Sequence, residues 1–279
     1  MHRRVYMAVI TISRQVAALG DEIAAATAKK LNYRFINRME IEKRITDLGF
    51  PAENLKKYDE RKPGFFASLA KNRDEYLDYL QTAVLEAASE GDCILIGRGA
   101  FIILDQLPNL IALRFVAKDS IRVERLMKEF SWDEKQARQR ITESDTNRLG
   151  FHKSFFNLEN EEPSHFHVVM NTGLLDIEIA SDIITGLVHN YITPQKEAAG
   201  KKKLEELLKA QRLVDTLIFE YKLNINFLRA VINGKTVVLQ GVADSTALVE
   251  KAVAISAKIL PDYKIESAVS IVQDFKAYP

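Results

Sequence analysis

The chain has 279 residues, of which 47% are hydrophobic and 28% are charged, proportions typical of a globular protein rather than a disordered or fibrous one. Its 39 basic and 38 acidic side chains nearly cancel, so no global field would attract nucleic acid or an anionic membrane. Any anion-binding site must therefore be local. The sequence predicts no nucleic-acid partner and gives no indication of membrane association.

The single cysteine and the N-terminus are both interpreted as unremarkable features of an intracellular chain. Cys93 lies in the apolar run CILIG, where a small buried side chain is the expected role and no neighbour would activate a thiol. The apolar stretch near the N-terminus is shorter than the hydrophobic region of a signal peptide, and no small-residue cleavage site follows it. No other segment approaches the ~18 apolar residues of a membrane span. We therefore expect a cytoplasmic protein.

Short apolar runs alternate with helical patterns over the first two thirds of the chain. Runs that are apolar on both faces are typical of parallel strands covered by helices on each side. The runs lie at residues 5–12, 34–37, 93–97, 111–117 and 166–171, and the helical patterns at 21–31, 38–48, 74–90, 119–130, 131–150 and 176–192. Asp21 with Glu22, Asp119, and either Ser131 or Asp133 are expected to cap three of these helices. The alternation predicts an α/β domain over residues 1–192.

The amino-acid composition of the chain changes near residue 193. Residues 193–203 are polar, contain a proline and a glycine and lack an apolar period, so they are interpreted as a linker. Residues 204–221 then show helical spacing, and Asn233-Gly234 between two β-rich arms predicts a hairpin over 227–244. A helix at 245–260 and a strand at 263–272 follow. Residues 204–279 are thus predicted to form a second, small α+β domain in the order α-β-β-α-β.

The loop after the first strand decides whether the larger domain could hold phosphate. A phosphate loop needs glycines whose backbone amides turn onto the phosphate, a lysine for the outer phosphates and a Ser or Thr for magnesium. Residues 14–20 read RQVAALG, so the loop has one glycine and no lysine. Asp21 and Glu22 follow, and an N-cap carboxylate would satisfy the helix amides itself. Taken alone, these residues favour a helix capped by its own side chain.

Four stretches taken together resemble the cytidylate kinase-like family, a divergent branch of the nucleoside monophosphate kinases. The first stretch is ITISRQ at residues 10–15, followed by Gly20 and by EIA at 22–24. The others are ILIGRGA at 94–100, DTNRLGFHKSFFN at 145–157 and VVMNTGLLDIEIASDII at 168–184. The similarity spans about residues 5–190 in matching order. The family loop typically reads Ser-Arg-Gln, an aromatic residue, then Gly-Ser-Gly-Gly-Arg-Glu-Ile, and it generally lacks the Walker lysine. Ser13, Arg14, Gln15, Gly20, Glu22 and Ile23 match this pattern, whereas Val16, Ala17, Ala18, Leu19 and Asp21 depart from it.

The resemblance implies a fold and a set of site residues. The fold is a parallel five-stranded sheet in the order 2-3-1-4-5 with helices on both faces, an ATP site on the first loop, an acceptor pocket and an arginine-bearing lid. The implied cofactors are ATP and Mg²⁺, both conditional on a working phosphate loop, and no separate metal site is predicted. The implied nucleotide or phosphate contacts are Ser13, Arg14, Gln15, Ala17, Ala18, Gly20, Arg140 and Lys153, and the implied catalytic residues are Arg98, Arg148 and Asp145.

The arginines among these residues would neutralise charge during phosphoryl transfer. Arg98 follows the third strand, at the carboxyl edge where ligands bind in open α/β sheets, and its flanking glycines would let a ligand approach. A surface ion pair is the alternative role for Arg98. Asp145 is the expected partner of Arg148, Arg138 and Arg140 are weaker lid candidates, and Arg14 is a candidate replacement for the missing lysine.

Histidine and aromatic residues are given structural roles. His165 and His167 lie two residues apart on one strand face without a third ligand in sight, which favours packing or surface roles over a metal site. Trp132 and the pair Phe155-Phe156 are expected to pack in the core or lid rather than to stack on bases.

Residues 204–279 resemble a BON domain in element order and in the passage VVLQGVADS, a family linked to binding of phospholipid or small ligands. Two functions remain open. One is phosphoryl transfer from ATP to CMP or a related small acceptor. The other is a non-catalytic protein that senses a nucleotide or another small ligand and signals through the second domain, with a homodimer compatible with either. A purely structural or interaction protein, with neither function, is a third interpretation.

Overall fold

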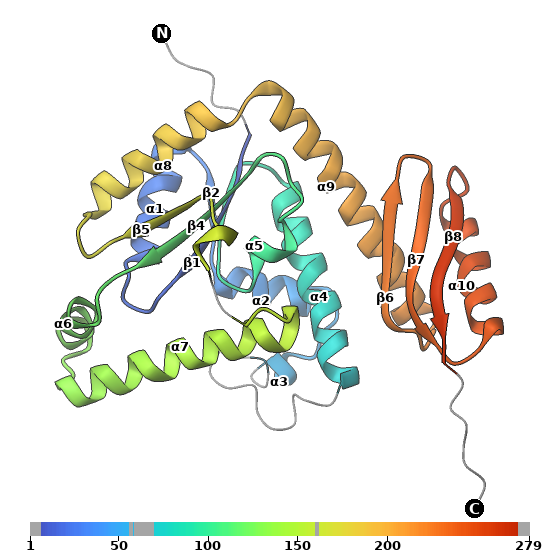
Figure 1. The fold of residues 1–279 in the computed structure, drawn as a ribbon, viewed down its shortest axis with the longest axis horizontal. Helices are drawn as coiled ribbons and strands as arrows, with labels where there is room; N and C mark the ends of the chain where they lie inside the picture. Colours follow the sequence, from blue (N-terminus) through green and yellow to red (C-terminus); the bar gives the residue numbers. More distant parts are fainter. Residues whose placement is uncertain (1–6, 56–57, 59–69, 160–161, 273–279) are drawn as a thin grey trace, which may run out of the picture. The chain divides into compact units, whose positions relative to one another are not determined.

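The computed structural model describes residues 7–55, 58, 70–159 and 162–272 (Figure 1). The chain divides into two compact units, Met1–Lys203 and Leu204–Pro279, and each is described by itself. In the described part of the chain, no helix has both the length and the hydrophobicity needed to cross a membrane.

A five-stranded parallel sheet forms the centre of the first unit (Figure 1). Its strands are β1 (Val9–Arg14), β2 (Arg34–Ile36), β3 (Cys93–Ile96), β4 (Leu110–Val116) and β5 (Val168–Asn171). Their spatial order is β2-β3-β1-β4-β5, and every neighbouring pair is parallel. All residues of β3 are buried, which is the burial that a strand covered on both faces shows. The predicted fold class of this unit is therefore confirmed.

Helices cover both faces of the sheet and its carboxyl edge. They are α1 (Gly20–Leu31), α2 (Arg38–Asp47), α3 (Ala52–Leu55), α4 (Ala70–Ser89), α5 (Ala100–Ile103), α6 (Asp119–Phe130), α7 (Glu134–Phe156) and α8 (Ile177–Tyr191), with a 3₁₀ turn at Pro163–His165. Helices α1 and α8 pack together on one face, where Ile23 and Ile184 join Ile10, Ile12 and Phe115 in a buried cluster. Helices α4 and α5 lie on the other face, and α6 and α7 lie at the carboxyl ends of the strands (Figure 1).

The helix starts only partly follow the predicted caps. Asp133, one of the two predicted alternatives, caps α7. Its side chain accepts a hydrogen bond from the backbone N–H of Gln136, and the Gln136 side chain accepts one from the backbone N–H of Asp133. The prediction for Asp119 is wrong: it is the first residue of α6, after an N-cap at Lys118 that makes no side-chain hydrogen bond. The aromatic predictions are confirmed for Phe155, which is buried among Tyr and Phe rings, and for Trp132, which stacks on a neighbouring phenylalanine.

Residues 194–203 of the segment predicted as a linker are helical. Helix α9 runs through Pro194–Asp215, and the Thr193 hydroxyl accepts a hydrogen bond of 3.2 Å from the backbone N–H of Lys196. Proline is favoured in the first turn of a helix, so Thr193-Pro194 starts this helix instead of breaking the chain. Gly200 is needed for packing, because a Cβ there would lie 1.9 Å from the Asn109 side chain.

The second unit is a small α+β domain with a mixed three-stranded sheet. Its elements are the end of α9 with a π-helical turn at Thr216–Glu220, then β6 (Asn226–Asn233), β7 (Thr236–Ala243), α10 (Thr246–Ile259) and β8 (Lys264–Ile271). Strands β6 and β7 form the predicted antiparallel hairpin, and β8 adds parallel to β7. The order of elements agrees with the predicted α-β-β-α-β arrangement.

Candidate functional site

The loop between β1 and α1 adopts the backbone that glycine normally supplies. Ala17 and Leu19 have φ angles of 60° and 55°, in the left-handed region that side chains disfavour. At both positions, the loop pattern of the cytidylate kinase-like family, which this sequence resembles, has glycine. Each non-glycine residue held there costs on the order of 1–2 kcal/mol. The loop therefore adopts a glycine-type conformation with alanine and leucine at these two positions.

The start of α1 is not capped by a side chain, contrary to the expectation for Asp21 and Glu22. The N-cap position is Leu19, and no side-chain hydrogen bond caps the helix in the described structure. The Asp21 carboxylate is instead 59% exposed and lies 3.7 Å from the Arg14 guanidinium. Arg14 extends across Gly20, where a Cβ would come within 2.6 Å of its side chain. The helix thus presents an uncapped, positively polarised N-terminus with one arginine beside it.

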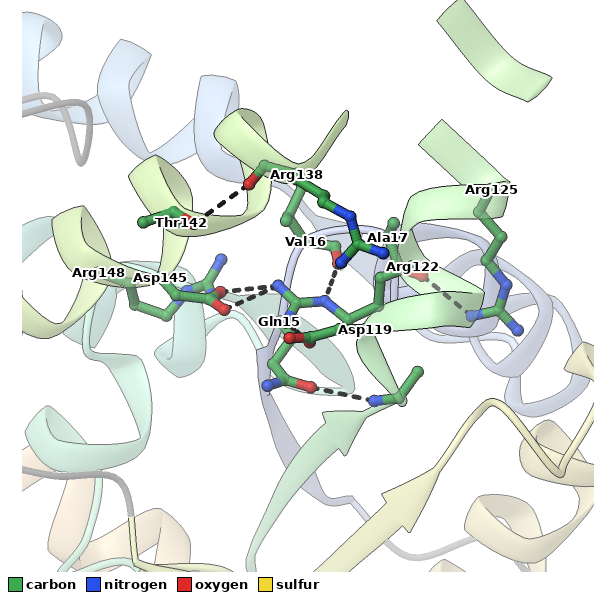
Figure 2. Close-up of polar contacts among 11 residues, drawn as sticks. Gln15, Val16, Ala17, Asp119, Arg122, Arg125, Arg138, Thr142, Asp145 and Arg148 are labelled. Atoms are coloured by element: carbon green, nitrogen blue, oxygen red, sulfur yellow. Dashed lines mark hydrogen bonds and ion pairs between the residues drawn. The ribbon is translucent and has the colours of Figure 1, made fainter. Parts of the chain in front are cut away.

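Three consecutive carbonyl groups of the loop, those of Val16, Ala17 and Ala18, are each held by a side chain from another element. Arg122 Nε donates to the oxygen of Val16 at 3.0 Å, and Arg125 Nη1 donates to the oxygen of Ala17 at 2.9 Å (Figure 2). The Thr172 hydroxyl, just after β5, donates to the oxygen of Ala18 at 3.0 Å. Since C=O and N–H point in opposite directions in a trans peptide, the amides that follow these carbonyls are turned away from the arginines.

A cavity of about 390 Å³ opens at this loop, a size within the usual range for small-ligand sites. Its walls come from the loop, the start of α1, α2, the end of α6 and the middle of α7. Its basic lining residues are Arg14, Arg38, Arg140 and Arg148, and its acidic ones are Asp21, Glu22 and Glu129. Clustered arginines beside an uncapped helix N-terminus are suited to an anion, because both supply N–H donors and positive charge.

An ion-pair network links this cavity to the loop. Asp145 on α7 accepts hydrogen bonds of 2.9 Å at both carboxylate oxygens from Arg122 Nη2 (Figure 2). The same carboxylate lies 3.7 Å from Arg148 Nη1, so the predicted pairing of these two residues is present in the structure. Arg122 is 1% exposed and also pairs with Asp119 at 3.0 Å. Asp145 therefore orients two arginines, and it is not itself a lining residue of the described cavity.

Arg98 is held away from this cavity by other protein groups. It is 1% exposed, forms an ion pair with Glu42 and donates a hydrogen bond of 3.0 Å to the carbonyl oxygen of Tyr58. Its guanidinium also lies over the Phe151 ring. The glycine after it does not leave room for a ligand as expected, because a Cβ at Gly99 would lie 2.3 Å from the Phe156 ring.

The other candidate residues fall into two groups. Gln15, Ala17, Gly20 and Arg140 line the cavity together with Arg14 and Arg148. Ser13, Ala18 and Lys153 do not: Ser13 is buried and accepts a hydrogen bond from Arg114, Ala18 is 1% exposed, and Lys153 pairs with Glu159 at 3.3 Å on the surface. Sequence reasoning missed Arg38, Arg122, Arg125 and Thr172. For Arg122 and Arg125, the sequence signal is their spacing, because residues three apart on a predicted helix lie on the same face and can contact the same loop.

His167 is engaged by protein groups at both ring nitrogens. Nδ1 accepts a hydrogen bond of 3.0 Å from the backbone N–H of Ala112, and Nε2 lies 3.2 Å from the Tyr191 hydroxyl. Burial lowers the pKa of His167, and the nearby Lys196 lowers it further. Among the described residues, no group of three or more His, Cys, Asp or Glu side chains is arranged to hold a metal ion.

Strand order and loop position define the class of protein to which the larger unit belongs. A parallel sheet in the order β2-β3-β1-β4-β5, with a loop suited to binding an anion between β1 and α1, is the P-loop fold of the nucleoside monophosphate kinases. Residues 9–174, more than half of the chain, match the model of the cytidylate kinase-like family. The chain belongs to this family.

Individual relatives cover the same part of the chain. A cytidylate kinase from Methanocaldococcus jannaschii is 24% identical over 185 residues, which are 65% of this chain and 98% of that protein. An uncharacterized protein from Eubacterium ventriosum has a crystal structure similar to this one, with a TM-score of 0.53, 19% identity, and coverage of 65% of this chain and 97% of the other. A shikimate kinase from Bacteroides thetaiotaomicron has a TM-score of 0.42 at 14% identity, with coverage of 65% and 98%.

Proposed function

We propose that the larger unit is an ATP-dependent phosphotransferase that moves the γ-phosphate of ATP to CMP or a related small acceptor. Membership of the cytidylate kinase-like family supports this proposal. The observation that carries it is the arginine-lined cavity at an uncapped helix N-terminus, directly after β1. In this proposal Arg14 and the first-turn amides of α1 bind the phosphates of ATP, and Arg140 and Arg148 neutralise charge from α7.

Magnesium would accompany ATP in this reaction and supply charge neutralisation between its outer phosphates. Among the side chains that line the cavity, Glu129 on α6 and Ser144 on α7 carry oxygen atoms, and oxygen ligands are the kind that Mg²⁺ prefers. The residues present thus fit a nucleotide-bound magnesium ion held partly by the substrate. Lys153 is proposed to have no phosphate contact, because it lies outside the cavity and pairs with Glu159.

A second function is favoured by specific features of the same site. Asp21 and Glu22 bring negative charge to the position where the triphosphate would lie. Arg98 forms an ion pair with Glu42 and donates a hydrogen bond to the carbonyl oxygen of Tyr58 instead of lining the cavity. These features support a protein that binds a nucleotide without transferring phosphate. In that case the smaller unit, whose sequence resembles a BON domain in its order of elements, would respond to the bound nucleotide.

Calorimetric titration with ATP·Mg²⁺ and with CMP, followed by an ADP-release assay across the nucleoside monophosphates, tests both functions. Turnover of ~1–100 s⁻¹ supports the kinase, as this is the ordinary range for such enzymes. Binding without ADP release supports the second function, and absence of binding to either ligand contradicts both.

A matched pair of variants assigns any binding to this cavity. Arg140 lines the cavity, whereas Arg138 lies on the same helix, pairs with Glu134 and lines a separate surface groove. Arg140→Met is expected to weaken ATP binding by about 10- to 150-fold, because one charge-assisted hydrogen bond is worth roughly 1.5–3 kcal/mol. Arg138→Met should leave affinity within about twofold of the original. Equal effects of the two substitutions would place the nucleotide elsewhere.

A further inference from the structure

Two arginines on α6 contact the backbone of the phosphate loop rather than the cavity. Arg122 donates to the carbonyl of Val16 and Arg125 to the carbonyl of Ala17 (Figure 2). Neither side chain is among the residues that line the cavity. We propose that Arg122 and Arg125 are positioning residues that hold the loop in its anion-binding conformation and so replace the glycines that the loop lacks. The consequence for nucleotide binding rests on the proposed function, but the effect on the loop itself does not.

The loop needs such support because its own residues oppose its conformation. Ala17 and Leu19 are in the left-handed region, where a Cβ crowds the backbone and the free chain prefers other angles. Such strain persists only where surrounding contacts over-determine the conformation. A guanidinium that donates to a backbone carbonyl fixes the orientation of that peptide group, because a hydrogen bond with a charged donor is stronger than a neutral one.

The arginines are themselves fixed by groups outside the loop. Arg122 is 1% exposed and is held by Asp119 on its own helix and Asp145 on α7. Arg125 Nη2 donates a hydrogen bond of 2.6 Å to the backbone oxygen of Thr172, whose hydroxyl in turn donates to the carbonyl of Ala18. The support for the loop is thus built from α6, α7 and the end of β5. A rigid clamp of this kind can impose backbone angles that a mobile surface side chain could not.

Side-chain packing also stabilises the conformation of the loop. Val16 and Ala17 contact a buried apolar cluster formed by Val123 and Leu126 of α6 with Ala137 and Ile141 of α7. The contact made by Ala17 needs a Cβ atom that glycine at this position would not have. In this chain, therefore, the loop is held by side-chain packing and by an arginine clamp, whereas glycine would make the same angles accessible without either.

A double-mutant cycle between the clamp and the loop tests this inference. Arg125→Met is made in the natural loop and in a loop carrying Ala17→Gly and Leu19→Gly, and Lys128→Met on the exposed side of α6 is the charge-matched control. ATP·Mg²⁺ affinity and the ligand-free thermal midpoint are measured for each full-length variant. Arg125→Met is expected to weaken binding about tenfold in the natural loop, equal to 1.4 kcal/mol, and less than about twofold in the glycine loop. The fall in the thermal midpoint should likewise be smaller with glycine.

The outcomes separate this inference from the proposed function. Equal effects of Arg125→Met in both loops, on affinity and on the thermal midpoint, would overturn the clamp. If no form binds ATP but the thermal effects are non-additive, the clamp is supported and the kinase is not. Arg125→Lys guards against a variant that fails to fold, because its single ammonium keeps the charge but not the two-sided contact with Ala17 and Thr172. It should fall between the original and Arg125→Met in the natural loop, and an Arg125→Lys variant as weak as Arg125→Met in both loops would contradict the clamp.

Discussion

Replacing Asp21 with asparagine should strengthen nucleotide binding. In the structure the Asp21 carboxylate lies 3.7 Å from the Arg14 guanidinium, and both residues line the cavity. The carboxylate therefore neutralises a cation that would otherwise face the phosphates, and it repels the phosphates directly. Asparagine keeps the size of the side chain and removes only its charge.

The size of this effect follows from Coulomb's law. Two unit charges at 3.7 Å interact by about 1 kcal/mol at the dielectric constant of water. This limit applies because the Asp21 side chain is 59% exposed, so solvent screens it strongly. A gain of about 1 kcal/mol corresponds to roughly fivefold tighter binding of ATP. Loss of a carboxylate from the first turn should cost helix α1 about 0.3–1 kcal/mol of stability.

Calorimetric titration of Asp21→Asn with ATP·Mg²⁺ at low and at high salt measures this gain. Asp47→Asn is the control, because Asp47 is exposed, lies outside the cavity and gives the same change in net charge. The gain should disappear near 1 M salt, where the Debye length is about 3 Å. Unchanged or weaker binding by Asp21→Asn at low salt, or an equal gain in Asp47→Asn, would refute the reasoning.

The structure also predicts three effects that need no ligand. The free energy of unfolding should fall as the pH drops below 6.5, because burial lowers the pKa of His167 in the folded protein and the histidine is therefore protonated at higher pH in the unfolded chain than in the folded one. A thermal midpoint that stays flat from pH 8 to 5, or an unaltered pH dependence in His167→Gln, would contradict this. Burial raises the pKa of Cys93 to about 12, so the native protein should react with a thiol reagent far more slowly than the unfolded chain; equal rates would refute it. Glu42→Gln should destabilise the fold by about 1.5–3 kcal/mol, since a neutral amide replaces the carboxylate that pairs with the buried Arg98; a fall in the thermal midpoint under roughly 2 °C would argue against this pairing.

Much of the fold could be predicted from local pattern. The apolar runs at β1, β3 and β4 are buried on both faces, and this burial is visible in the sequence as continuous hydrophobicity. The Asn233-Gly234 hairpin was equally predictable, although the pairing of Asn233 with Thr236 places the turn at Gly234 and Lys235. The helix Pro194–Asp215 was predicted only from residue 204 onward, because the polar composition of residues 194–203 hid a Thr-Pro helix start.

The site was less predictable, because its decisive contacts join residues that are distant in the chain. Arg122 and Val16 are 106 positions apart, and Arg125 and Ala17 are 108. Arg98 carries the same chemistry as Arg148 and occupies the expected strand end, yet Glu42 and Tyr58 engage it. A motif gives the residue type and the approximate position, but the orientation of a long side chain depends on its neighbours in space.

By itself, the sequence determined the parallel sheet, the order of the elements and the identity of the loop after β1 as the place to look for an anion. Hydrophobic period and local motif suffice for this, because they act within a few residues. Only the tertiary structure decided that the loop keeps a glycine-type backbone, that α1 is uncapped, and which arginines face the cavity. The φ angles of Ala17 and Leu19 oppose local preference, so they depend on contacts made after the sheet, α6 and α7 have packed together.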